Sequence, residues 1–243
     1  MSTCLQLDVG NSSAKWRLVR DDQVLLRGEF RSTDAGALAA MLRCSERLDH
    51  IWISSVASPS AEQELARVLR GRWGVEPWFA RAQARTGDLR NSYADPKRMG
   101  VDRWLAMLAA RNRERGRFCV VDAGSALTID FVGADGGHEG GYIIPGSALM
   151  ERALLLDTDR VRFDEAAEYS LSPGRSTAEA VRHGIALAQA GAVVMALQQA
   201  GTEPVALLYC GGAGELLMQL VGRGGVWVPD LVFEGLTLKA EQR

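Results

Sequence analysis

Residues 4–19 read CLQLDVGNSSAKWRLV, and this stretch decides the fold. An apolar run suited to a β-strand ends at a carboxylate, Asp8, and a second β-rich run begins near Lys15. The residues between the two runs include Gly10, Asn11 and Ser12, which are common in turns, so the stretch predicts a β-hairpin. Taken alone, a hairpin would explain Asp8 as a turn residue and no more.

Residues 118–132, FCVVDAGSALTIDFV, repeat this pattern near the middle of the chain. Again an apolar run ends at an aspartate, Asp122, with a glycine, Gly124, two residues later and a second β-rich run beyond. A repeat at this distance indicates two domains of one design. The chain has 243 residues, of which 47% are apolar, enough for two domains of about 110 to 120 residues, each with its own core. We predict lobes at 1–116 and 117–243.

The remaining sequence alternates between helical and strand-like patterns, which predicts an α/β fold. One expected helix, 61–70, has Ser60 in the N-cap position and Gly71 just beyond its end. A helix and a strand are expected to complete the chain after residue 210. The other expected helices are 34–46, 104–115, 147–156 and 176–199, and the other strands are 50–57, 140–144 and 204–210.

Charge and hydropathy argue against several classes of protein. The net charge is −2 and the arginines are scattered among acids, so nothing indicates a nucleic-acid partner. The longest apolar run, 184–197, is too short to span a membrane and contains Gln189, and the N-terminus lacks the pattern of a signal peptide. We therefore expect a soluble, cytoplasmic protein with no membrane role.

The cysteines and histidines do not suggest a zinc site, because such a site needs clustered thiolates and imidazoles and the sequence has no C-x-x-C pair. Three of the cysteines lie in apolar, strand-like runs, which favours core packing in a reducing compartment. The four cysteines are Cys4, Cys44, Cys119 and Cys210, of which Cys44 is the one outside such a run. The three histidines are His50, His138 and His183.

A glycine-containing turn beside a carboxylate suits phosphate chemistry. Such a turn lets backbone amides approach phosphate oxygens, serine and asparagine add donors, and a carboxylate can hold Mg²⁺. The sequence contains neither G-x-x-x-x-G-K-[ST] nor G-x-G-x-x-G, and neither the H-R-D and D-F-G kinase pair nor G-x-S-x-G. The two hairpins are therefore the candidate phosphate sites, and facing each other across a cleft they would grip a nucleoside triphosphate.

Six stretches, in an order and spacing that cover nearly the whole chain, resemble the type III pantothenate kinases, which begin coenzyme A synthesis. This family belongs to the acetate kinase, sugar kinase, Hsp70 and actin superfamily. The resemblance implies an α/β protein of two ribonuclease H-like (actin-like ATPase) lobes with a nucleotide cleft between them. The stretches are DVGNSSAKW (8–16), YADPKRMGVDRW (93–104), DAGSALTID (122–130), GGYIIPG (140–146), GRSTAEAVRHG (174–184) and PDLVFEGL (229–236).

The resemblance also implies roles for individual residues and a homodimer. It implies that ATP is the phosphoryl donor, pantothenate the acceptor and 4′-phosphopantothenate the product, with Mg²⁺ as a cofactor. Asp102 resembles the general base, Asp122 the ligand of a monovalent cation, K⁺ or NH₄⁺, and Asp8 a residue near Mg²⁺. The ATP-binding positions are Asp8, Val9, Gly10, Asn11, Ser12, Ser13, Ala14, Lys15 and Ser125, and the substrate-binding positions are Tyr93, Gly100, Val101, Asp102, Arg103 and Thr177.

Two positions depart from the commonest family pattern. Ser125 stands where threonine is usual, which keeps the hydroxyl, and Asp95 stands where asparagine is frequent, which leaves the role of residue 95 open.

Each substrate position also has a simpler interpretation. Asp102 could be only a helix N-cap, a weaker base, and Thr177 could cap the helix 176–199. Arg103 could be a solvated helix residue, and Tyr93 could belong to the core.

Two other functions remain on the same scaffold. One is a different kinase or phosphohydrolase, such as a sugar kinase or exopolyphosphatase, and the other is a non-enzymatic accessory regulator of transcription. Three aspartates at Asp8, Asp102 and Asp122 favour catalysis, because a protein that only binds would not need all three.

Overall fold

The computed structural model describes residues 2–31, 35–44 and 46–242, which form two compact units. Unit 1 contains Met1–Ala109 and Leu231–Arg243, and unit 2 contains Ala110–Asp230. The predicted lobes, 1–116 and 117–243, differ from these units in two places. Residues 110–116 belong to unit 2, and the last helix of the chain belongs to unit 1. The predicted cleft between the lobes stays a prediction.

Unit 1 is built on a five-stranded sheet in the order β3-β2-β1-β4-β5. Strand β1 lies in the middle, antiparallel to β2 and parallel to β4. The sequence predicted the hairpin of β1 and β2 but missed β3, which extends the hairpin to a third antiparallel strand. The strands are β1 (Thr3–Val9), β2 (Ser13–Arg20), β3 (Gln23–Arg31), β4 (His50–Ser55) and β5 (Trp78–Phe79).

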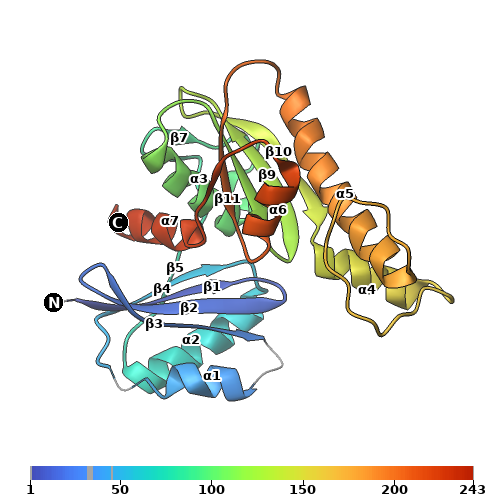
Figure 1. Ribbon diagram of the computed structural model, residues 1–243. Coiled ribbons are helices and arrows are strands. Elements are labelled where there is room, and N and C mark those ends of the chain that lie inside the picture. The colour runs from blue at the N-terminus through green and yellow to red at the C-terminus, as the bar shows by residue number, and fades with distance from the viewer. Residues whose placement is uncertain (1, 32–34, 45, 243) are drawn as a thin grey trace. The chain divides into compact units, whose positions relative to one another are not determined.

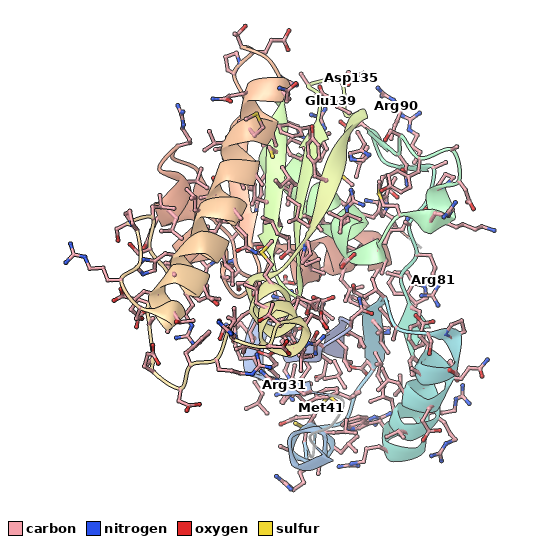
Figure 2. The ribbon with its side chains drawn as sticks, turned by 90° about the vertical axis from the view of Figure 1, so that its right-hand side faces the viewer. Arg31, Met41, Arg81, Arg90, Asp135 and Glu139 are labelled. Atoms are coloured by element: carbon pink, nitrogen blue, oxygen red, sulfur yellow. The ribbon has the colours of Figure 1, made fainter. Side chains whose placement is uncertain are left out.

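Helices cover both faces of this sheet (Figure 1). On one face, α1 (Ala35–Leu42) and α2 (Pro59–Trp73) pack through Met41 and Leu69 against strand residues that include Leu5 and Leu7. Figure 2 shows Met41, whose side chain is fully buried, on α1. On the other face lies α7 (Leu231–Ala240), whose Thr237 Oγ1 accepts a hydrogen bond of 2.9 Å from Gln6 Nε2.

The rest of unit 1 connects β5 to α3 (Val101–Arg113), which crosses the boundary between the units. This connection contains the short strands β6 (Arg85–Thr86) and β7 (Leu89–Arg90) and the 3₁₀-helix η1 (Pro96–Arg98). Lys239 of α7 reaches it and donates a hydrogen bond of 2.9 Å to Thr86 Oγ1. Burial lowers the pKa of this ammonium, because desolvation disfavours its charged form.

Unit 2 repeats the arrangement, with a five-stranded sheet in the order β10-β9-β8-β11-β12. Helices α5 (Thr177–Gln199) and α6 (Gly214–Val221) pack on one face of this sheet through Ala190, Val193 and Leu217. Helix α4 (Ser147–Asp157) follows the last strand of the β8–β10 meander and contacts α5. The strands are β8 (Phe118–Ala123), β9 (Ala126–Val132), β10 (His138–Pro145), β11 (Ala206–Cys210) and β12 (Val226–Trp227).

The two sheets therefore confirm the predicted α/β fold and the predicted repeat. Asp8 and Asp122 are each the second-to-last residue of the middle strand. Because successive side chains of a strand alternate between faces, each aspartate lies on the face opposite the apolar core residues of its strand. Those core residues are Leu5 and Leu7 in β1, and Cys119, Val121 and Ala123 in β8.

Several predicted helix ends are wrong. Helix α2 begins at Pro59 and not at 61, because Ser58 rather than Ser60 is its N-cap. It also runs past Gly71 to Gly74, which takes the left-handed conformation (φ 68°) that ends the helix. Helix α3 begins at Val101 instead of 104. After residue 210 the predicted helix and strand are present as α6 and β12, but the sequence missed the further helix α7. Of the predicted helix 34–46, residues 34 and 45 lie outside the described part of the chain.

The apolar run 184–197 belongs to a longer helix than the sequence suggested. Helix α5 has 23 residues and is long and apolar enough to cross a membrane by length and composition alone, which is weak evidence because core helices pass the same test. One side of α5 is part of the unit 2 core, and Gln189 donates a hydrogen bond of 3.2 Å to the carbonyl oxygen of Pro145.

Gly235 of α7 gives a test of the packing in unit 1. A Cβ at this position would lie 1.9 Å from the backbone carbonyl oxygen of Leu105 on α3, so Gly235→Ala should force the helices apart. We expect it to lower the free energy of unfolding by about 1 to 3 kcal/mol or more, measured by urea denaturation.

The matched control is Gly71→Ala, near the end of α2, where a Cβ would meet nothing within 4 Å. This change should be neutral or stabilise by up to about 1 kcal/mol, because alanine has the higher helix propensity. Equal stability of the two variants would contradict the close approach of α7 and α3.

Candidate active site

The turn between β1 and β2 carries most of the predicted ATP-binding positions. The amide of Gly10 donates a hydrogen bond of 3.0 Å to the carbonyl oxygen of Ser13, which closes the turn. Asn11 and Ser12 at its tip are exposed, while Ala14, the second residue of β2, is buried. The polar side chains of the turn are thus accessible to a ligand.

Asp8 lies beside this turn and is half-buried. Its Oδ1 accepts a hydrogen bond of 2.9 Å from the hydroxyl of Ser54, a fully buried residue of the neighbouring strand β4. Lys15 is the cross-strand partner of Asp8 on β2. Among the residues that the structure describes, the Lys15 ammonium has no hydrogen-bond or ion-pair partner, so its charge is available to an anion.

In unit 2, the turn between β8 and β9 has the same position and is one residue shorter, closed by a hydrogen bond of 3.0 Å from the Gly124 amide to the carbonyl oxygen of Ala126. Ser125 is exposed at this turn, and its carbonyl oxygen accepts a hydrogen bond of 3.0 Å from the amide of Gly146. Asp122, half-buried, lies against Gly211 at the end of β11. A Cβ at Gly211 would lie 2.4 Å from Asp122 Oδ1, and the backbone there has φ of 82°, so glycine is required.

Gly211 is a site residue that our sequence reasoning missed. The signal was present in the pair Gly211–Gly212 directly after a predicted strand, because adjacent glycines at the end of a strand mark a close approach of the backbone to another group.

Tyr93 and Arg103 lie against each other in unit 1. Arg103 Nη1 donates a hydrogen bond of 2.8 Å to the Tyr93 hydroxyl, and the guanidinium carbon lies 5.7 Å from the centroid of the tyrosine ring. Arg103 is buried, so the interpretation of it as a solvated helix residue is wrong. Tyr93 is only half-buried and is not a core residue. The structure thus brings two predicted substrate positions together.

Asp102 is the second residue of α3 and not its N-cap. The carbonyl oxygen of Gly100 accepts a hydrogen bond of 3.1 Å from the Trp104 amide, which makes Gly100 the residue that precedes the helix. Asp102 Oδ1 accepts a hydrogen bond of 2.8 Å from the Arg103 amide. A Cβ at Gly100 would lie 2.5 Å from the same oxygen, so Gly100 leaves the room in which the carboxylate sits. Val101 between them is buried.

Asp95, whose role the sequence left open, caps η1. Its Oδ1 accepts a hydrogen bond of 3.1 Å from the Lys97 amide. Asparagine would supply the same acceptor, which explains why either residue suits this position.

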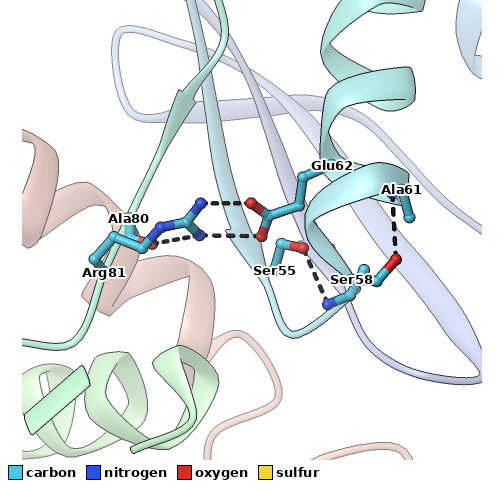
Figure 3. A network of polar contacts seen from close by, with 7 residues as sticks. Ser55, Ser58, Ala61, Glu62, Ala80 and Arg81 are labelled. Atoms are coloured by element: carbon cyan, nitrogen blue, oxygen red, sulfur yellow. Dashed lines mark hydrogen bonds and ion pairs between the residues drawn. The ribbon is translucent and has the colours of Figure 1, made fainter. Parts of the chain in front are cut away.

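Gly100 and Val101 line a cavity of about 720 Å³ that lies wholly within unit 1. The start of α2 and the segment after β5 form another part of its wall, where Arg81 and Glu62 pair through two hydrogen bonds, one of 3.0 Å (Figure 3). Figure 3 also shows Ser58, whose hydroxyl accepts a hydrogen bond from the amide of Ala61 at the start of α2.

Thr177 belongs to unit 2, where it is exposed as the first residue of α5. The helix is capped by Ser176, whose Oγ accepts a hydrogen bond of 3.2 Å from the Glu179 amide, so the interpretation of Thr177 as the cap is wrong. Thr177 lines a mostly apolar cavity of about 1120 Å³ between α4 and α5. Its place in the predicted substrate site stays a prediction, because the other substrate positions belong to unit 1.

Within residues 2–31, 35–44 and 46–242, no group of three or more His, Cys, Asp or Glu side chains is placed to hold a metal ion. Asp8 and Asp122 each offer a half-buried carboxylate at a turn that also carries exposed polar groups. A single carboxylate fits Mg²⁺, which is commonly held by one or two carboxylates together with substrate phosphates.

The cysteines pack as predicted: all four are free thiols, and Cys4, Cys119 and Cys210 are buried. Burial raises the pKa of the Cys4 thiol to about 12, which makes it a poor nucleophile.

Comparison with known structures shows the fold. A protein from Campylobacter jejuni described as a Baf family transcriptional activator is 20% identical with a TM-score of 0.62, and the match covers 98% of both chains. A protein from Sinorhizobium meliloti described as a 2-dehydro-3-deoxygalactonokinase is 16% identical with a TM-score of 0.65, over 98% of this chain and 96% of that one. These likenesses confirm the predicted α/β fold.

Comparison of the sequence identifies the family. A type III pantothenate kinase of Marinobacter nauticus is 37% identical over 232 residues, covering 96% of each chain. One of Ectopseudomonas mendocina is 38% identical over 242 residues, covering 96% of this chain and 97% of the relative. The family profile of type III pantothenate kinase matches residues 4–199. With profile and relatives in agreement over most of its length, this chain belongs to the type III pantothenate kinases.

Proposed function

We propose that the chain works through the two hairpins and the start of α3. The enzyme transfers the γ-phosphoryl group of ATP to pantothenate, giving 4′-phosphopantothenate in the first step of coenzyme A synthesis. The observation that carries this function is the match to relatives named type III pantothenate kinase over 96% of this chain. A coupled assay of ADP release with pantothenate, a sugar and polyphosphate as alternative acceptors tests it, and it also separates the other kinases of this scaffold.

The first hairpin is the proposed site of the ATP phosphates. Asn11 and Ser12 offer exposed donors, and the ammonium of Lys15 lacks a partner among the described residues. Asp8 is the proposed Mg²⁺ residue, with Ser54 holding its carboxylate through the hydrogen bond of 2.9 Å. When bound, Mg²⁺ would supply neutralisation of phosphate charge. The residues Val9, Gly10, Ser13 and Ala14 shape the same loop.

The start of α3 is the proposed site of the attacking hydroxyl. Asp102, whose carboxylate sits in the room that Gly100 leaves, would accept or orient the proton of the pantothenate hydroxyl. Phosphoryl transfer has a loose transition state, so positioning of this hydroxyl matters more than basic strength. Arg103, oriented by Tyr93, presents a guanidinium to an anion, either the acceptor carboxylate or the transferred phosphoryl group. Thr177 of unit 2 stays a proposed substrate contact.

The second hairpin is the proposed site of a monovalent cation and of a further nucleotide contact. Asp122 would bind K⁺ or NH₄⁺, and the exposed Ser125 would contact the nucleotide through its hydroxyl. Backbone carbonyl oxygens around this turn are further oxygen ligands of the kind such cations prefer.

A homodimer is supported by the outer side of α5. Its inner side lies in the unit 2 core, yet its outer side is also apolar, with Leu187 60% and Met195 55% exposed. Gly184, Leu187, Ala188, Gly191 and Met195 follow a helical spacing that places them on one stripe. The apolar cavity between α4 and α5 adjoins this helix. We assign the stripe to contact with a second copy and place the enzyme in the cytoplasm, where ATP is available.

The same substitution, aspartate to asparagine, should have different kinetic effects at Asp102 and at Asp8. Asp102→Asn should lower kcat by about 10²-fold or more, since general-base contributions are roughly 10² to 10⁴. ATP affinity should hardly change, and added Mg²⁺ should not restore the rate. Asp8→Asn should instead weaken binding of the metal-nucleotide complex, so that higher ATP or Mg²⁺ recovers part of the activity.

Steady-state kinetics with calorimetric ATP titration measure both effects. A fully active Asp102→Asn enzyme would reduce Asp102 to a local helix-start residue and remove it from the mechanism.

The cation proposal predicts ion-dependent activity. The enzyme should need K⁺ or NH₄⁺ and slow down in Na⁺ or Tris-only buffer, and Asp122→Asn should blunt this difference because the charge that attracts the cation is lost. Rates are compared at constant ionic strength. Equal rates of the unchanged enzyme in every buffer would eliminate the cation from the reaction.

The dimer proposal predicts that Leu187→Glu yields a folded monomer, because a charge on the apolar stripe would have to be buried in the contact. Leu25→Glu is the control, since Leu25 of β3 is 39% exposed and lies in unit 1. Equilibrium sedimentation at micromolar concentration should give a dimer for the unchanged protein and the control. A monomer for the unchanged protein would refute the proposal.

A further inference from the structure

The cavity of about 720 Å³ in unit 1 has a positively charged lining. Four ionisable side chains line it, and three of them, Arg81, Lys97 and Arg98, are cationic, while Glu62 is the one carboxylate among the described residues there. Two cations therefore remain in excess, although the whole chain has a net charge of −2. A surplus of positive charge around a cavity attracts anions.

The charges of the cavity are not equally available. Arg81 and Glu62 pair through two parallel hydrogen bonds, so this arginine is engaged by the carboxylate (Figure 3). Lys97 and Arg98, by contrast, are exposed, and neither has a side-chain hydrogen bond or ion pair within the part of the chain that the structure describes. The unpaired charge of the cavity thus comes from these two neighbouring residues.

The backbone holds these two cations in place. They belong to η1, which begins at Pro96. The Asp95 side chain accepts a hydrogen bond from the Lys97 amide, and the Asp95 carbonyl oxygen accepts one of 3.0 Å from the Arg98 amide. The next residue, Met99, is buried and anchors the segment. A short rigid turn presents the charges with less loss of entropy than a flexible loop would.

The same cavity wall continues into the proposed substrate site. Gly100 and Val101 line the cavity, and Asp102, the proposed partner of the attacking hydroxyl, follows directly at the start of α3. Pantothenate carries its hydroxyl groups at one end and a carboxylate at the other. Asp102 is adjacent in sequence to this wall, so an acceptor held at Asp102 by its hydroxyl would place its anionic end along the wall if it extends past Val101 and Gly100.

Resting on the proposed function, we propose that Lys97 and Arg98 are specificity residues that draw the carboxylate of the acceptor into the unit 1 cavity. They act by charge at the cavity wall and take no part in the transfer itself. They therefore favour an acidic acceptor over a neutral one of the same shape.

The test compares Lys97→Gln, Arg98→Gln and the double variant with Arg43→Gln, a control in unit 1 that removes an exposed cation outside the cavity lining. Each single change should raise KM for pantothenate about two- to fivefold, as expected for exposed charge pairs, and the double change about tenfold. In all these variants, kcat and the KM for ATP should stay unchanged. Raising the salt concentration from about 50 mM to about 300 mM should shrink the effect.

Panthenol, the neutral alcohol analogue of pantothenate, separates charge from shape. Its inhibition constant should be the same in the unchanged enzyme and in the double variant. The proposal would be overturned if the double variant weakened inhibition by panthenol as much as it raised KM for pantothenate, or if KM for pantothenate did not change. A rise in KM for ATP alone would also overturn it, because the cations would then bind the phosphates of ATP. If the unchanged enzyme did not phosphorylate pantothenate, the proposed function would fail instead.

Discussion

The middle strand of each sheet fixes the position of the chemistry. Strands β1 and β8 are hydrogen-bonded on both sides, to an antiparallel neighbour and to a parallel one. With both edges paired, the register cannot slip without moving the apolar side chains out of the core. Asp8 and Asp122, one residue from the strand ends, are therefore held on a fixed face beside a fixed turn. The proposed metal and nucleotide sites at both hairpins depend on this constraint.

The sequence predicted this part of the fold well because the constraint is local. The pattern of a strand, an aspartate and a glycine-containing turn lies within a short continuous stretch, and it occurs twice in the chain. Both the hairpins and the repeat are confirmed. The missing strand β3 shows the limit of such reasoning. Its residues VLLRG lie on an edge and are mostly exposed, so they lack the alternation that marks a half-buried strand.

The site could be predicted less fully, because it depends on contacts that sequence spacing does not show. Tyr93 and Arg103 were each selected by family resemblance, but their hydrogen bond of 2.8 Å requires the chain to fold back between them. Gly211 escaped notice because its partner, Asp122, is 89 positions away in the sequence. The start of α2 was misplaced because Ser58 and Ser60 are equally good caps by residue type, although Pro59, which suits the first helical position, favours Ser58.

The position of α7 has a consequence for the order in which the chain folds. Unit 1 consists of the first 109 residues and the last helix, whereas unit 2 is continuous. During synthesis from the N-terminus, the strands of unit 1 emerge first but lack the helix that covers one face of their sheet, including the partner of Gln6. Unit 2 has all its parts before α7 appears. The half of the protein that is made first is therefore the half that is completed last.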